Sequence, residues 1–173
     1  MTLRVRAGLA PALLIPLFAL LIPSALQAAP TAVPADAPTI QKAIAAQKGH
    51  VVLVNFWATW CGPCVAEFPA IVQVSRQYKK QGLSVITVSA DAARDRITKV
   101  QPFLVKQGVT FPVYLERSVD PEDFINAFDT TWQGDLPRTF IYDRQGHRVK
   151  TLSGEQTAQS LAAAVAPYLA RTR

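Results

Sequence analysis

The stretch Val51–Trp57 constrains what this chain can fold into more than any other segment. Every residue in it except Asn55 is apolar, and most are β-branched or aromatic. A half-exposed strand alternates apolar and polar residues, whereas an unbroken apolar run favours a strand that is buried on both faces. The segment therefore predicts a central strand of a sheet, with other elements covering both of its sides.

A second segment typical of a buried strand, Leu83–Ser89, follows this one, and several segments with helical spacing lie before and after it. The expected elements are helix 39–48, strand 51–57, helix 64–81, strand 83–89, helix 94–107, strand 111–115, helix 120–128, a hairpin of 138–142 and 147–152, and a last helix that includes 161–169. The second helix contains Pro69, which should kink it because proline lacks an amide hydrogen. Alternating strands and helices followed by a hairpin predict an α/β fold, with a central mixed sheet flanked by helices.

The composition fits one folded domain and offers few groups that bind metals. The chain has 173 residues, of which 50% are hydrophobic and 17% charged, and this balance excludes a disordered chain. Its only cysteines are Cys61 and Cys64, which excludes a disulfide-stapled mini-protein and a four-cysteine zinc site. The two histidines, His50 and His147, are too few and too widely separated to suggest a metal centre. We expect neither a metal nor a cofactor.

The first part of the chain has the layout of a targeting segment. Arg4 and Arg6 precede a stretch without charges, 7–35, whose centre is strongly apolar and which then offers small residues around Ala28. This order is typical of a secretory signal. The apolar run is also about long enough to cross a bilayer, by the roughly 20-residue rule, so an uncleaved anchor is the alternative. Either alternative exports the domain.

The domain organisation follows from these segments. We predict a signal peptide or N-terminal membrane anchor over 1–29 and a linker over the Pro- and Ala-rich residues 30–38. A single domain should then occupy 39–173.

Charge excludes one class of partner and leaves another open. Without Arg4 and Arg6 the formal net charge falls from +6 to about +4, and no dense run of Lys or Arg suggests nucleic-acid binding. Acidic residues gather between Glu116 and Asp135. A solvated face explains this cluster, and a partner-binding patch is the alternative.

The two cysteines lie where thiol chemistry is favoured. Cys61 falls at the junction between the predicted strand and the next helix, where the first helix amides are unpaired and carry partial positive charge. This setting stabilises the nucleophilic thiolate. Pro63 suits the first helical turn because its missing amide hydrogen costs nothing there. Cys64 lies one turn further on the same side, where it should be more buried and close enough to form a disulfide.

This arrangement provides an attacking and a resolving cysteine. Cys61 attacks a substrate disulfide to form a mixed disulfide, and Cys64 then attacks Cys61 and releases the reduced substrate. Half of a zinc site is disfavoured because the chain has no second cysteine pair. A purely structural disulfide is disfavoured because the loop it closes is very short, so its entropic contribution is small.

Three segments carry a resemblance to a known family. Phe56–Cys64 resembles the active-site segment of the thioredoxin superfamily, and Val65–Pro69 is similar to its exported TlpA/ResA-like branch. The segment 136–146 resembles the loop with a cis-proline and the hairpin that follows it. The resemblance covers about 38–170, and it implies a thioredoxin-like fold with a TlpA-type central insertion.

The resemblance also implies roles for individual residues. Cys61 and Cys64 would form the redox-active disulfide, with Cys61 as the exposed nucleophile. Pro137 would be the cis-proline beside the disulfide, and the Leu136 backbone would bind an extended substrate. From the sequence alone Pro137 could equally be a trans turn proline. The substrate-contacting rim would consist of Trp60, Gly62 and Pro63.

One departure from the cytosolic thioredoxins concerns buried polar residues. Those proteins usually have an aspartate where this chain has Asn55, and an amide cannot accept a proton in that role. Glu67 lies three residues after Cys64, a position that the TlpA/ResA-like branch associates with the active site. We expect Glu67 to tune the thiol pKa values or to accept the Cys64 proton. A solvent-exposed helix glutamate is the alternative.

The dipeptide between the cysteines indicates the direction of exchange. Gly62-Pro63 is shared with reducing thioredoxins, whose potentials are near −270 mV, against about −120 mV for a strong oxidant. We therefore expect a periplasmic reductase of exported client proteins, which include proteins of cytochrome c biogenesis by analogy. Because the chain has no other cysteines, a separate membrane thiol carrier would supply the electrons.

Three other functions are weighed against this one. A disulfide oxidase or isomerase uses the same residues in another direction. A copper-binding metallochaperone would use the cysteine pair and His147. A thiol peroxidase requires a proline and a threonine at set spacings before its cysteine, and Val54 and Ala58 occupy those positions instead. Each of these functions is compatible with a monomer, which is the oligomeric state that we expect.

Overall fold

A computed structural model describes residues 30–169 of the chain. Its elements, in order, are β1 (Val33–Ala35), α1 (Ala37–Ala45), β2 (Val51–Trp57), α2 (Gly62–Tyr78), the 3₁₀ turn η1 (Lys79–Gln81), β3 (Leu83–Ser89), the π-helical turn η2 (Arg96–Val100), α3 (Gln101–Gln107), β4 (Val113–Glu116), α4 (Pro121–Phe128), β5 (Arg138–Tyr142), β6 (Arg148–Ser153) and α5 (Ala158–Leu169). The predicted order of strands, helices and hairpin is confirmed.

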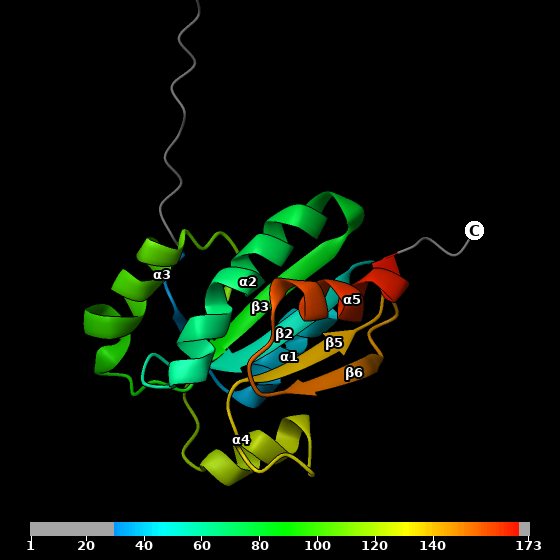
Figure 1. Ribbon diagram of the computed structural model, residues 1–173. Helices are drawn as coiled ribbons and strands as arrows, with labels where there is room; N and C mark the ends of the chain where they lie inside the picture. Colours follow the sequence, from blue (N-terminus) through cyan, green and yellow to red (C-terminus); the bar gives the residue numbers. More distant parts are fainter. Residues whose placement is uncertain (1–29, 170–173) are drawn as a thin grey trace, which may run out of the picture.

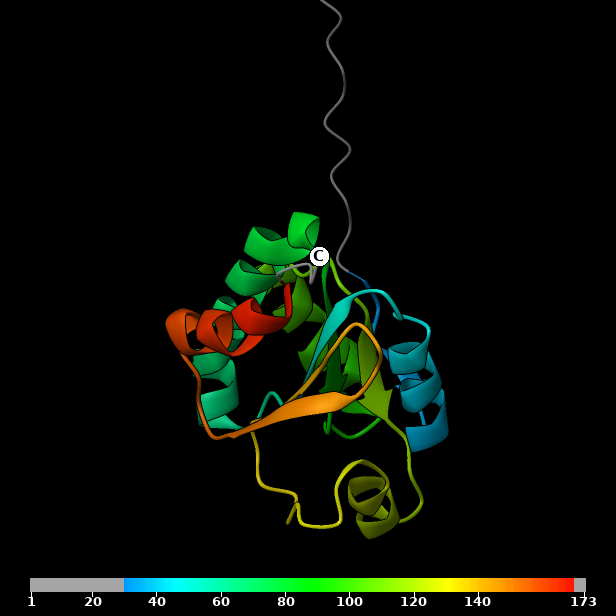
Figure 2. The ribbon, with the colours of Figure 1, turned by 90° about the vertical axis from the view of Figure 1, so that its right-hand side faces the viewer.

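One six-stranded mixed sheet organises the domain. The strand order is β1-β4-β3-β2-β5-β6; β1, β4, β3 and β2 are parallel, β5 is antiparallel to β2, and β6 is antiparallel to β5. Helices α2, α3 and α5 cover one face of this sheet (Figures 1 and 2). Helix α1 covers the other face, and α4 lies near the arrowheads of the parallel strands (Figure 1). The predicted α/β fold is therefore confirmed.

Strand β2 is the centre of the core, as its apolar run predicts. All of its residues are buried, and they alternate between two hydrophobic clusters. Leu53 and Trp57 pack with residues of α2 and α5, whereas Val54 and Phe56 pack with residues of α1 and α4. Both faces of the strand are packed against the core. This packing fixes the position of its carboxyl end, from which the chain leads to Cys61.

The connection from β3 to β5 contains an additional strand and helix. Strand β4 lies between β1 and β3 in the sheet, and α4 follows it before the chain returns to β5. The helix predicted over 94–107 is divided: residues 96–100 form the π-helical turn, and α3 begins at Gln101, with Pro102 in its first turn. The Gln101 amide donates to the Arg96 carbonyl in the π-helical pattern, so the amide hydrogen that Pro102 lacks falls where the π-helical turn passes into α3.

The segment predicted as a linker is part of the fold, which corrects the expected boundary at residue 39. Val33–Ala35 forms β1 and pairs with β4, and Ala32 and Ala35 are almost fully buried. Pro34 fits this position because β1 is an edge strand, where one side of the backbone has no neighbour. The composition of residues 30–38 gave no sign of this pairing, since the partner strand lies far along the chain.

The predicted signal peptide or anchor falls on residues 1–29, which lie outside the described part. Within residues 30–169, no helix has both the length and the apolar character needed to cross a membrane.

Candidate active site

The two cysteines form a disulfide at the beginning of α2. Their Cα atoms are 5.2 Å apart. Cys61 is the N-cap of the helix, with an extended backbone, and its Sγ accepts a hydrogen bond from the Cys64 amide at 3.3 Å. The outer sulfur therefore lies against the unpaired amides of the first helical turn, which favour negative charge on it. This is the geometry that the sequence predicts.

The two sulfur-bearing residues differ in their access to solvent. The exposed fraction of Cys61 is 7%, and that of Cys64 is only 1%. Gly62 and Pro63 beside them are exposed, and the side chain of Trp60 is 66% exposed. Of the two cysteines, Cys61 is thus the one that an incoming group can reach.

The expected cis peptide bond is present between Leu136 and Pro137. Pro137 is buried, Leu136 is half-buried, and both lie immediately before β5, which pairs with β2. Leu136 and Trp60 line the same cavity, so the structure brings the predicted rim and the predicted proline loop together. Their contact with substrate stays a prediction.

Glu67 is buried, with only 1% of its surface exposed, which contradicts the alternative of a solvent-exposed helix glutamate. Its Oε1 accepts a hydrogen bond from Asn55 Nδ2 at 2.8 Å, and its Oε2 accepts one from the Gln156 amide at 2.8 Å. Burial raises the pKa of Glu67 to about 7, although both hydrogen bonds act in the opposite direction. The carboxyl can therefore gain or lose a proton close to neutral pH.

Asn55 links three elements through its side-chain amide. It is fully buried in β2, and its Nδ2 donates to Glu67 on α2 and also to Thr139 Oγ1 on β5, at 2.9 Å. An amide that uses both of its hydrogens in this way holds the Glu67 carboxyl in one position. Sequence reasoning identified Asn55 as a departure from thioredoxins but did not predict its bond to Glu67.

The buried carboxylate of Asp91 was missed by the sequence analysis. Its Oδ2 accepts hydrogen bonds from the Thr59 amide at 2.9 Å and the Ser89 hydroxyl at 2.7 Å, and its Oδ1 accepts one from the Thr59 hydroxyl at 2.5 Å. Only 2% of Asp91 is exposed. A signal for it existed, because Asp91 lies two residues after the end of Leu83–Ser89 and the carboxyl ends of neighbouring parallel strands meet at one edge of a sheet.

The described residues give no support to a metal centre. Among residues 30–169, no group of three or more His, Cys, Asp or Glu side chains could hold a metal ion. His147 is exposed in the β5–β6 hairpin, where its Nδ1 lies 3.5 Å from Asp143 Oδ2. Because β5 runs from Pro137 beside the site to this hairpin, His147 and the cysteine pair lie at opposite ends of the strand. The structure does not bring the residues of the copper alternative together.

The geometry agrees with comparisons to known proteins. A family model described as the AhpC/TSA family matches residues 26–150. A curated relative, the thiol-disulfide oxidoreductase ResA of Geobacillus kaustophilus, is 32% identical over 114 residues, which cover 66% of this chain and 60% of the relative. The chain thus spans less than two thirds of the length of that relative.

Solved structures with the same fold come from other bacteria. A thioredoxin-related protein from Neisseria meningitidis serogroup B is 32% identical, with a TM-score of 0.58, over 70% of this chain and 86% of that one. A thiol:disulfide interchange protein of the thioredoxin family from Chlorobium tepidum is 26% identical, with a TM-score of 0.60, over 73% of this chain and 84% of the other. The thioredoxin-like fold that the sequence predicts is confirmed by these likenesses.

Proposed function

The chain belongs to the AhpC/TSA family, and we propose that it is a thiol–disulfide oxidoreductase in which Cys61 and Cys64 carry the redox chemistry. The observation that carries this proposal is the disulfide at the start of α2, with Cys61 at the helix N-cap and Cys64 buried behind it. The curated relative and one of the solved structures bear names of the same activity.

The exchange proceeds in two steps that balance in electrons. In the reduced protein the Cys61 thiolate attacks one sulfur of a client disulfide, so a mixed disulfide forms and the other client sulfur leaves as a thiolate. The Cys64 thiolate then attacks Cys61 Sγ, which closes the internal disulfide and releases the second client sulfur. Two electrons pass from the cysteine pair to the client, and the client thiolates take up two protons.

Glu67 supplies a route for the proton of Cys64. It lies one helical turn after Cys64 in α2, and a carboxyl whose pKa is about 7 is suited to accept or return a proton at neutral pH. Asn55 and the Gln156 amide hold both carboxyl oxygens, so the group is positioned rather than mobile. Glu67→Gln should therefore alter the cysteine titrations and the exchange rate.

We assign the protein the direction of a reductase, acting on exported clients in the periplasm. Gly62-Pro63 between the cysteines favours a low potential, and the N-terminal targeting pattern favours export. An upstream membrane thiol carrier would return electrons to the pair, since the chain has no further cysteine. Proteins of cytochrome c biogenesis are the client class that family analogy supports. The N-terminal segment either is cleaved or tethers the domain to the inner membrane.

Mixed-disulfide trapping tests the proposal. Cys64→Ala should leave clients attached to Cys61 in the native host, visible as reducible high-mass species, and Cys61→Ala/Cys64→Ala is the matched control that should trap nothing. The potential of the pair decides the direction: a value near −270 mV supports a reductase, and one near −120 mV supports the oxidase alternative. Absence of any trapped species and of any disulfide exchange by the purified protein would overturn the proposed activity.

A further inference from the structure

Four cations gather where two helices of the same layer end. Arg76 lies in the last turn of α2, and Lys79 and Lys80 lie in the turn η1 that follows it. Lys106 lies in the last turn of α3. Arg76 donates a hydrogen bond to the Gly108 carbonyl at 2.8 Å, which brings the ends of α2 and α3 together. All four cationic residues are exposed, and we call the surface that they form the cationic patch.

The patch lacks acidic partners. The chain has no Asp or Glu between Glu67 and Asp91, the stretch that holds the end of α2. It has none between Asp95 and Glu116 either, where α3 ends. Within residues 30–169, none of the four cations forms an ion pair. Exposed cations without acidic partners leave a positive potential at the surface, which attracts anions.

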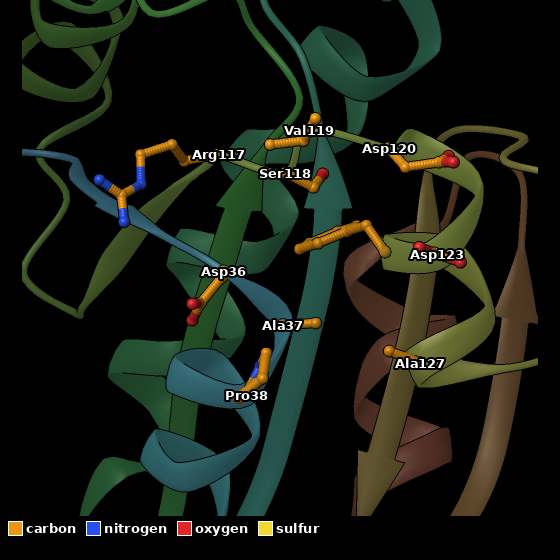
Figure 3. A pocket seen from close by; sticks show the side chains of 10 residues that line it. Asp36, Ala37, Pro38, Arg117, Ser118, Val119, Asp120, Asp123 and Ala127 are labelled. Carbon is orange, nitrogen blue, oxygen red and sulfur yellow. The ribbon is translucent and has the colours of Figure 1, made fainter.

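Acidic residues gather at the other end of the domain. Helix α2 ends at the top of Figure 1, whereas α4 lies at the bottom, near the arrowheads of the parallel strands. The exposed residues Asp120, Glu122 and Asp123 lie at the beginning of α4, where Figure 3 shows two of them. The charge of the domain is therefore divided between two ends, and the positive end turns toward an anionic surface.

The N-terminal segment joins the domain beside the patch. Strand β1 pairs in parallel with β4, with Val33 opposite Tyr114, so the residues that precede β1 run alongside those that precede β4. The residues before β4 follow from the end of α3, which Gly108 caps. The described part of the chain thus begins next to α3, as Figure 1 shows.

The apolar run of the predicted targeting segment is close to this point along the chain. Seven residues separate Ile22, where the run ends, from Pro30, and even fully extended backbone spans at most about 30 Å over this distance. A bilayer that holds the run therefore lies within reach of the patch. Lys and Arg residues near a bilayer that contains anionic lipids are attracted to its surface.

We propose that the cationic patch binds the anionic headgroups of the bilayer beside which the N-terminal segment places the domain. The ends of α2 and α3 then lie against the membrane, and the acidic end with α4 points away from it. Helix α2 has 17 residues, which span about 25 Å, so the disulfide at its beginning lies up to that far from the headgroups and stays open to soluble clients. This inference goes beyond the proposed exchange activity and depends on the predicted export.

Amine labelling of the full chain in lipid nanodiscs tests the patch. The discs contain phosphatidylcholine alone or a mixture with anionic phosphatidylglycerol, and mass spectrometry follows the reaction of each lysine with a neutral acylating reagent. Lys79, Lys80 and Lys106 should react at least about threefold more slowly in the anionic discs, because headgroups cover them. Lys42 is the internal control, since it is exposed on α1, which covers the other face of the sheet. Equal rates of the patch lysines in the two kinds of disc would overturn the proposal.

Charge reversal separates the position of the cations from the net charge. Lys80→Glu/Lys106→Glu should abolish the difference in Lys79 labelling between the two kinds of disc. Lys42→Glu/Lys150→Glu changes the net charge equally at exposed residues outside the patch, so Lys79 should keep its difference. The same result in both variants would contradict a specific patch.

Salt tests whether the attraction is electrostatic. About 1 M salt shortens the screening length to about 3 Å, so the labelling difference in the parent chain should disappear. A difference that persists there would contradict binding by charge.

Reduction of a small aromatic disulfide keeps this inference apart from the proposed function. Both double variants should reduce it at the rate of the parent chain, which shows that they fold, because neither changes the cysteine pair. A parent chain that reduces the disulfide but labels equally in both kinds of disc would refute the patch alone. A parent chain that labels as expected but reduces nothing would support the patch and refute the oxidoreductase activity.

Discussion

Two buried carboxyl groups lie at the carboxyl end of the central strands, and they differ in what surrounds them. Asp91 accepts three hydrogen bonds, two from Thr59 and one from Ser89. Glu67 accepts two, from Asn55 and the Gln156 amide, and burial raises its pKa to about 7. The two acids therefore differ in kind: Asp91 fixes the backbone that precedes Cys61, whereas the Glu67 carboxyl can gain or lose a proton close to neutral pH.

The largest effect should come from removing the anchor. Asp91→Ala leaves the Thr59 amide and two hydroxyl groups without their acceptor, which should lower the free energy of unfolding by about 4 kcal/mol in urea denaturation. Asp95→Ala is the control, because the half-buried Asp95 carboxylate pairs only with the exposed Lys99 side chain, and the change should cost under about 0.5 kcal/mol. Similar losses for both variants would break the distinction drawn for Asp91.

Glu67 should make stability depend on pH. Its folded pKa of about 7 lies above the ordinary value of 4.5, so the folded state binds this proton more tightly than the unfolded state does. The contribution is fully present below about pH 4.5 and is lost as the pH rises through about 7, to a total of roughly 3 kcal/mol. Urea denaturation of the oxidised protein across this range measures it.

The matched variant for this dependence is Glu67→Gln, which has no titrating group at the site. Its stability curve should lack the decline between about pH 4.5 and 7. The Gln side chain has one acceptor oxygen and one NH2 group where the carboxylate has two acceptor oxygens. If its oxygen accepts from the Gln156 amide, the Asn55 amide has to rotate so that its oxygen accepts from the new NH2 group. A decline of the same size in both proteins would show that another group causes it.

A smaller loss of stability should come from removing only one of the two bonds that Asp91 accepts from Thr59. Thr59→Val keeps the amide donor but removes the hydroxyl donor, so it should cost about 1.5 kcal/mol and slow the attack of Cys61, two residues away. Thr59→Ser restores the hydroxyl and should return both stability and exchange rate to nearly those of the parent chain. If the serine variant behaved like the valine variant, the hydroxyl bond to Asp91 would have no part in the effect.

The smallest effect should come from Gln156→Ala. Glu67 accepts the backbone amide of Gln156 and not its side chain, so the pH dependence of stability should stay unchanged. The lost side-chain bonds are two exposed ones to the Ser153 and Gly154 carbonyls and a part-buried one from the Ser160 hydroxyl, and their loss should cost about 1 kcal/mol or less. A shift of the pH dependence in this variant would mean that the Gln156 side chain acts on Glu67.

Much of the fold could be predicted because its signals are local. The boundaries of β2 and β3 agree with the runs that predicted them, since almost every residue within each strand is buried. Asp120 and Pro121 predicted the start of α4, because a cap and a first-turn proline act within a few residues. The strand β1 was missed because short Pro- and Ala-rich segments resemble linkers, and burial against a distant strand is what makes this one a strand.

The sequence by itself determined the buried central strand, the order of elements and the placement of Cys61 and Cys64 at a helix start, because periodicity, caps and spacing are properties of neighbouring residues. Only the tertiary structure decided the environment of the buried acids. The burial of Glu67 and the bonds from Thr59 to Asp91 depend on segments far apart in the chain. Desolvation and hydrogen bonding act through space, so no local pattern reports them.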